Sequence, residues 1–141
     1  VTRVEGRLIV TGDRRHTAQR VSDYLRAEAR KELSIAVSRL TRQIGRPASR
    51  ITIRDPRTRW GSCSSNGNLS FSWRLIMAPI SILTYVAAHE VAHLREANHG
   101  PRFWALVGEL HPSFREDRQE LKRLAFDLNR YGGPINNELA S

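Results

Sequence analysis

The chain has 141 residues, of which 40% are hydrophobic and 26% charged, and its formal net charge is +9. This length and composition predict one globular domain with a single hydrophobic core. No stretch approaches the roughly 18 apolar residues of a membrane span and the only cysteine, Cys63, cannot close an internal disulfide, so we expect a cytoplasmic protein without membrane contact.

The positive charge lies in the first part of the chain. Residues 1–60 hold 15 Lys and Arg against 6 Asp and Glu, whereas residues 61–141 hold 8 of each kind. Basic surfaces bind phosphate groups, so nucleic acid or a nucleotide is one partner hypothesis. However, Tyr24 is the one aromatic residue among the basic residues before Trp60. The sequence therefore gives little support for nucleic-acid binding through stacking of aromatic rings on bases.

The N-terminal part predicts a short strand and a long helix. Residues 4–10 alternate loosely between polar and apolar side chains, and residues 7–10 are the best strand candidate. Residues 17–44 carry apolar side chains at helical spacing, and Gly45 and Pro47 end that pattern. We expect the apolar face of this helix to cover a sheet.

The middle of the chain predicts a small sheet. Residues 51–53 alternate as a strand, and residues 60–64 and 68–73 flank Ser65-Asn66-Gly67, which is a strong hairpin signal. An extended peptide can add to an open sheet edge through backbone hydrogen bonds, and this hairpin is a candidate for such an edge. The alternative is a hairpin that only covers the core.

A second helix is predicted over residues 79–94, where Pro79 suits the first position and apolar residues recur every three or four positions. It contains His89-Glu90-x-x-His93. Two imidazoles four residues apart lie on one side of a helix and can bind one metal ion, and the adjacent carboxylate can reach a water molecule on that ion. The pattern predicts a catalytic zinc site.

A third ligand is expected after this helix. His99 would lie too far along a continued helix to share the metal, but Pro101 disfavours helical geometry just before it, so a turn can bring His99 back. Glu109 and His111, on or just after the next helix, are the competing candidates. A solvated or capping His99 is the alternative reading.

Two helices are predicted after that turn. Residues 101–110 are mostly apolar and Pro112 stops them, and Ser113-Phe114-Arg115-Glu116 has the pattern of a capping box that opens the last helix. Residues 132–141 are expected to form a flexible tail.

Several motifs together carry a family resemblance, and they occur in this order: Arg59-Trp60-Gly61-Ser62-Cys63, His89-Glu90-x-x-His93, and Asn98-His99 with Phe103-Trp104. The sequence resembles the YgjP-like metallopeptidase-domain family, which is related to the WLM and SprT-like zincins. The resemblance covers about residues 18–131. Metzincins have the same spacing of the three histidines. However, they have Gly where this chain has Glu96, and their methionine follows the active-site helix, whereas Met77 precedes it.

The resemblance implies an α+β, zincin-like fold: a small, mostly antiparallel sheet, a long N-terminal helix, an active-site helix and two further C-terminal helices. It implies that His89, His93 and His99 bind Zn²⁺ and that Glu90 is the catalytic acid and base. Family members usually carry a longer β-rich segment at the N-terminus. We therefore expect one domain over residues 1–141, with residues 1–12 as the remnant of that segment in the C-terminal part of a longer chain.

The leading functional hypothesis is a zinc-dependent metallopeptidase that hydrolyses peptide bonds of a peptide or protein substrate through a zinc-bound water activated by Glu90. The alternatives are a metal-dependent nucleoside triphosphate pyrophosphatase and a nucleic-acid-associated zincin. Arg102, His111 and Tyr131 are candidates to stabilise the oxyanion. Cys63 is interpreted as a small buried side chain rather than a nucleophile or ligand.

Overall fold

The computed structural model describes residues 2–4, 7–9, 14–55 and 59–129, and the tail predicted at 132–141 lies outside them. In chain order the elements are β1 (Thr2–Val4), β2 (Arg7–Ile9), α1 (Arg14–Ile44), β3 (Arg50–Arg54), β4 (Gly61–Cys63), β5 (Asn68–Ser72), the 3₁₀ helix η1 (Trp73–Met77), α2 (Ile80–Ala92), α3 (Pro101–Leu110) and α4 (Phe114–Asn129). The α+β class is confirmed, and the predicted elements occur in the predicted order, with β1 and η1 as elements that were not predicted. Within this part of the chain, no helix is both long and apolar enough to cross a membrane.

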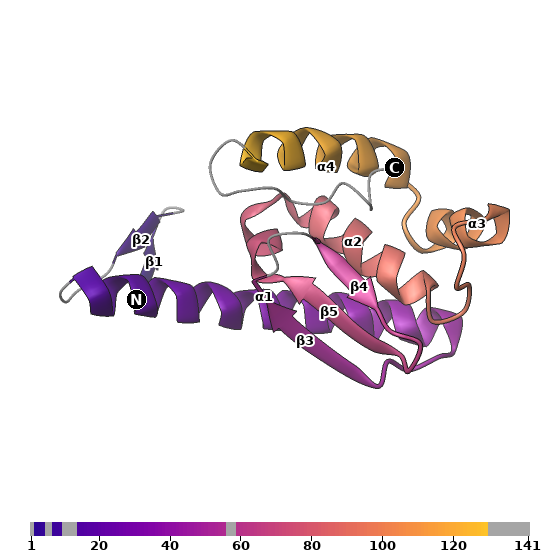
Figure 1. Ribbon diagram of the computed structural model, residues 1–141, viewed down its shortest axis with the longest axis horizontal. Helices are drawn as coiled ribbons and strands as arrows, with labels where there is room; N and C mark the ends of the chain where they lie inside the picture. The colour runs from indigo at the N-terminus through magenta and orange to yellow at the C-terminus, as the bar shows by residue number, and fades with distance from the viewer. Residues whose placement is uncertain (1, 5–6, 10–13, 56–58, 130–141) are drawn as a thin grey trace.

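The main sheet has the strand order β3-β5-β4, and β1 and β2 form a separate antiparallel pair (Figure 1). β4 and β5 form the predicted antiparallel hairpin, but β3 runs parallel to β5. The expectation of a mostly antiparallel sheet therefore fails for its longest pairing. The hairpin occupies only one edge of β5, and β3 takes the other edge in a register that sets Ile51 beside Leu69 and Ile53 beside Phe71. Parallel pairing thus puts four apolar side chains on one face.

Helix α1 covers this apolar face, as predicted. Its second half buries Ala29, Leu33, Val37 and Leu40, which belong to one core cluster with the central strand β5 and with α2. The first half of α1 projects beyond the sheet in Figure 1, and its side chains from 16 to 28 are exposed or half-buried. The core that supports the site is therefore made by the second half of α1, the sheet and α2.

Glycine and proline set the element boundaries that the sequence predicted. Gly45 and Gly67 adopt positive φ angles of 71° and 83°, which end α1 and close the turn between β4 and β5. Pro79 is the N-cap of α2, and Pro101 occupies the first turn of α3. These turns decide where α2 begins and where the chain reverses after it.

Helix α4 is attached to the rest of the domain by a buried polar cluster. The Asp117 carboxylate accepts hydrogen bonds from Ser81 of α2 (3.2 Å) and from Ser113 (3.0 Å), and it pairs with His111 Nε2 at 2.5 Å. The hydroxyl of Ser113, predicted to cap the helix backbone, thus donates to Asp117 instead. Asp117 and His111 are both only 8% exposed, so these contacts satisfy polar groups that water barely reaches.

Candidate metal centre

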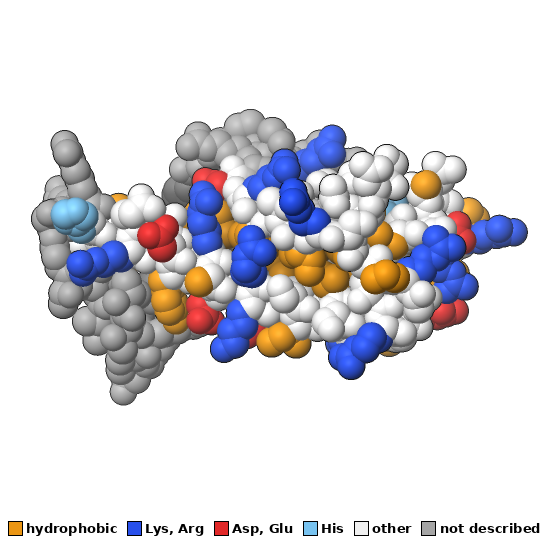
Figure 2. Space-filling view, turned by 90° about the horizontal axis from the view of Figure 1, so that it is seen from below, with side chains coloured by type: hydrophobic (Ala, Val, Ile, Leu, Met, Phe, Trp, Pro, Cys, Tyr) orange, Lys and Arg blue, Asp and Glu red, His pale blue; other side chains and the backbone are white. Residues whose placement is uncertain are grey.

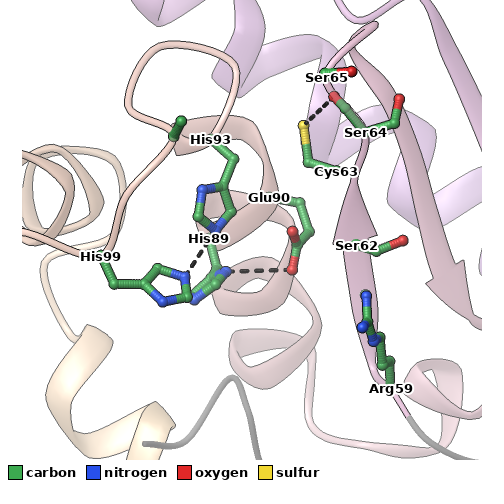
Figure 3. A pocket seen from close by; sticks show the side chains of 11 residues that line it. Arg59, Ser62, Cys63, Ser64, Ser65, His89, Glu90, His93 and His99 are labelled. Atoms are coloured by element: carbon green, nitrogen blue, oxygen red, sulfur yellow. Dashed lines mark hydrogen bonds and ion pairs between the residues drawn. The ribbon is translucent and has the colours of Figure 1, made fainter.

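Three histidines converge at the end of α2. His89 and His93 lie one turn apart on this helix, and His99 follows in the segment that leads to α3. One ligand atom from each of the three imidazoles lies within 4.8 Å of the other two, and the three rings point toward one another in Figure 3. Among the described residues, this is the cluster of His, Cys, Asp and Glu that could hold a metal ion.

The chain after α2 turns back because the helix ends at Ala92. The amide of Leu94 donates to Val91 O at 3.0 Å, and Arg46 of the loop before β3 donates to Leu94 O at 3.1 Å. These contacts occupy backbone groups that a continued helix would use itself. The predicted reversal before Pro101 is therefore present, and it brings His99 to the two histidines of α2.

The orientation of His93 is set on both sides of its ring. Its Nδ1 lies 3.1 Å from Glu96 O, so the proton resides on Nδ1 and Nε2 is left with a lone pair. This Nε2 lies 2.9 Å from His99 Nε2, and the Phe103 ring stacks on His93 with a centroid distance of 4.5 Å. Burial lowers the pKa of His93 against the opposing effect of Glu90. The ring is thus kept neutral, as a metal ligand must be.

Glu90 lies beside the histidines in a position that water hardly reaches. The residue is 2% exposed, and its Oε2 is 3.2 Å from Nδ1 of His89, which is 1% exposed. On the other side, a Cβ added at Gly61 of β4 would lie 3.1 Å from Glu90 Cγ and 3.2 Å from its Oε2. Gly61 therefore leaves the space in which the carboxylate sits, between α2 and the sheet.

A cavity of about 350 Å³ opens over these groups. The residues that line it are the three histidines, Glu90, Ala97, and residues 59 and 61–65, which include β4 (Figure 3). Cys63 is one of the lining residues, and burial, followed by the charge of Glu90, raises the pKa of its thiol to about 11. The thiol is therefore protonated near neutral pH, which agrees with the interpretation of Cys63 as a small packed side chain rather than a nucleophile.

Arg59 is a lining residue that the reasoning from residue chemistry did not single out. It lies two residues before β4, is exposed, and borders the same cavity as Glu90 (Figure 3). Its position in the Arg59-Trp60-Gly61-Ser62-Cys63 motif was the available signal, because Gly61 of that motif contacts Glu90.

The other candidates named from the sequence lie elsewhere. His111 pairs with Asp117, and Glu109 and Arg102 border a separate hollow between α3 and the end of α2. Neither competitor for the third ligand position therefore joins the histidine cluster, and neither Arg102 nor His111 lines the cavity. Tyr131, the remaining oxyanion candidate, lies outside the described residues.

Of the described basic residues before position 60, only Arg59 lines this cavity. On the face shown in Figure 2, Lys and Arg side chains are scattered along the length of the molecule rather than aligned in one stripe. Binding of nucleic acid by the basic N-terminal half stays a prediction. Its signature would be an affinity that falls steeply with salt and depends on Arg residues before position 60.

The residues present fit a metal ion. Neutral imidazole nitrogens suit Zn²⁺, and a site with three protein ligands that faces a cavity has the composition of a catalytic centre, since structural zinc sites are normally closed by four protein ligands. Ligand nitrogens around tetrahedral zinc lie roughly 3.3 Å apart. The observed spacing therefore requires only modest adjustment of the three rings.

An α+β fold with a His-Glu-x-x-His helix, and with a third histidine returned by the following turn, defines a zincin-like metal-dependent hydrolase. The chain belongs to the YgjP-like metallopeptidase-domain family, which it matches over residues 4–124. The solved structure of the metallopeptidase zymogen abylysin from Pyrococcus abyssi is similar in fold, with a TM-score of 0.55 and 16% identity over 74% of this chain and 98% of that one. No curated protein sequence matches the chain significantly.

Proposed function

We propose that this protein is a zinc-dependent peptidase in which His89, His93 and His99 bind the metal and Glu90 is the catalytic acid and base. The observation that supports it most is the arrangement of the four side chains. Three imidazole groups converge at one end of a cavity, and the buried carboxylate of the next residue along α2 faces the same cavity. A structural metal site has no need of that carboxylate.

The three imidazoles would hold the ion through ring nitrogen atoms, and the surroundings of His93 favour its neutral state. When bound, zinc supplies positive charge that polarises a peptide carbonyl and makes water more acidic. Glu90 accepts the proton of the attacking water on a carboxylate oxygen and returns it to the departing amine. Its enclosure between α2 and Gly61 limits the orientations of the carboxylate, so little reorganisation precedes proton transfer.

A peptide substrate would bind along β4. This strand pairs with β5 on one side, and among the described strands none pairs with its other side. An extended peptide can add to such an edge through backbone hydrogen bonds, which places its carbonyl groups beside Glu90 without demanding a particular side chain. Arg59, just before β4, would contribute positive charge toward the polarised carbonyl oxygen.

The test compares the wild-type protein with Glu90→Gln, both purified with zinc. Casein, a peptide library and nucleoside triphosphates are assayed side by side. We expect hydrolysis of peptide bonds by the wild type, and a loss of about a hundred- to ten-thousand-fold in Glu90→Gln with full zinc content. Hydrolysis of triphosphates alone would replace the peptidase by the pyrophosphatase alternative. Loss of zinc in Glu90→Gln would make this residue a ligand.

A further inference from the structure

The ring of Phe103 contacts all three histidines of the candidate metal centre. Its centroid lies 4.9 Å from the ring centroid of His89 and 4.5 Å from that of His93. The corresponding distance to His99 is 4.8 Å. Phe103 is 0% exposed and is not among the residues that line the cavity. It therefore packs against the imidazoles from inside the protein, out of reach of a substrate in that cavity.

The start of α3 brings Phe103 to this position. Pro101 occupies the first turn of the helix, which therefore begins two residues after His99. The buried residues of α3 recur at helical spacing and form one face: Phe103, Leu106, Val107 and Leu110. Phe103 is the first of them, so the face by which α3 joins the core also reaches the histidines.

The Phe103 ring meets each histidine at a different angle. It stacks on His93 with 26° between the ring planes, meets the ring of His89 edge to face at 76°, and is tilted by 56° against that of His99. Aromatic rings in stacked and edge-to-face arrangements attract one another. The ring of Trp104 packs on Phe103 at 5.0 Å and 80°, so Phe103 is itself held in place. Because one rigid ring makes all three contacts, it couples the orientations of the three imidazoles.

His99 has the most to gain from this contact. His89 is buried within α2 and His93 is half-buried at its end, whereas His99 is exposed and lies between α2 and α3, outside any helix or strand. An exposed side chain on an irregular segment loses much conformational freedom when it is fixed by an ion. Packing against Phe103 keeps the His99 ring beside His93, where the two Nε2 atoms are 2.9 Å apart. Part of the ordering therefore precedes metal binding, which raises the affinity.

We infer that Phe103 is a positioning residue of the metal centre: its buried ring holds His89, His93 and His99 in their convergent arrangement and thereby raises the affinity of the site for zinc. The inference rests on the zinc site of the proposed function and is independent of which substrate is hydrolysed. It also gives α3 a role in the site, because this helix supplies no metal ligand among the three histidines.

The test measures the zinc affinity of the full chain by competition with a chromophoric chelator. Residues that orient metal ligands typically contribute about ten- to a hundredfold to metal affinity, and we expect a loss in this range for Phe103→Leu, which keeps an apolar side chain but removes the ring. The matched control is Leu110→Ala. It also opens space in the buried face of α3, but about 10 Å further along the helix, so zinc affinity should change by less than about threefold. Thermal unfolding of the zinc-free proteins shows that both variants fold. If Phe103→Leu does not, Phe103→Met replaces it, because methionine fills the space of a ring with a flexible chain.

A double variant separates positioning from a general effect on the core. If Phe103 acts largely by ordering His99, Phe103→Leu should weaken zinc binding much less in a His99→Ala background than in the wild type, because coupled residues are not additive. The inference is overturned by wild-type zinc affinity in Phe103→Leu, by an equal loss in Leu110→Ala, or by an undiminished effect in the His99→Ala background. If the wild type binds zinc tightly and Phe103→Leu weakly, but no peptide is cleaved, the peptidase proposal fails and the positioning role stands. A wild type that binds no zinc overturns both.

Discussion

Replacement of Gly61 by alanine tests how the carboxylate of Glu90, the proposed catalytic group, is positioned. A Cβ at this position would lie 3.1 Å from Glu90 Cγ and 3.1 Å from Val86 Cγ1, and 3.2 Å from Glu90 Oε2. Carbon atoms in contact normally lie about 3.5–4.0 Å apart. Val86 is 0% exposed and packed in the core, whereas Glu90 borders the cavity, so Glu90 is the side chain with room to give way. Glu90 must therefore shift by several tenths of an ångström.

The magnitude follows from this shift. A displacement of about 1 Å in a catalytic group can cost on the order of a hundredfold in rate, so a smaller shift of Glu90 is expected to lower kcat/KM by about ten- to a hundredfold. The extra methyl group should also reduce the free energy of unfolding by about 1–3 kcal/mol. The zinc content should not change, because no histidine atom is among the three nearest to the added Cβ.

The assay is peptide hydrolysis, with zinc content and thermal unfolding measured on the same samples. Gly100→Ala is the matched control, since nothing lies within 4 Å of a Cβ added there, although the residue follows His99. It should keep activity within about twofold. The double variant Gly61→Ala/Glu90→Gln should be no less active than Glu90→Gln alone, because coupled residues are not additive. Unchanged activity in Gly61→Ala, or full additivity in the double variant, would refute the positioning role.

Two further predictions concern groups around the site. In chelator-treated protein at pH 8, Cys63 should react with iodoacetamide about a hundredfold more slowly than a thiol at the usual pKa of 9.0, because its pKa is raised to about 11 and only the thiolate reacts. The reaction rate of Cys63 should rise as the pH approaches 11, and it should be faster in Glu90→Gln, where the charge that raises the thiol pKa is removed. A rate equal to that of a free thiol would show that burial does not raise the pKa of Cys63. Asp117→Ala should lower the free energy of unfolding by about 3–5 kcal/mol in urea titrations, since it leaves the buried His111 without its acceptor. Glu116→Ala, an exposed neighbour, should change it by less than about 0.5 kcal/mol, and equal effects of the two substitutions would show that the buried cluster is not what stabilises α4.

The elements that the sequence predicted depend on local chemistry. The turn at Gly67 needs a residue that tolerates positive φ. Pro79 is the N-cap of α2 and Pro101 lies in the first turn of α3, where the missing proline N–H removes no helical hydrogen bond. The spacing of His89 and His93 on one side of a helix is local in the same sense. Each of these features involves residues close together in the chain, so the sequence alone contains the information.

Contacts between distant segments could not be predicted in this way. The parallel pairing of β3 with β5 depends on which edge of β5 is left open, and the proximity of Gly61 to Glu90 depends on how β4 packs on α2. His111 was a reasonable ligand candidate by residue type, but its Nε2 is engaged by the Asp117 carboxylate. Helical periodicity left His99, Glu109 and His111 open as candidates for the third ligand. The family resemblance named His99 among them.

Zinc content per chain, measured by elemental analysis on protein purified without chelator, tests the central claim most directly. We expect close to one zinc ion in the wild type and in Glu90→Gln, and a sharp loss when His89, His93 or His99 is changed to alanine. Full zinc in His99→Ala together with loss in Glu109→Ala would contradict the ligand set, and with it the proposed metal centre.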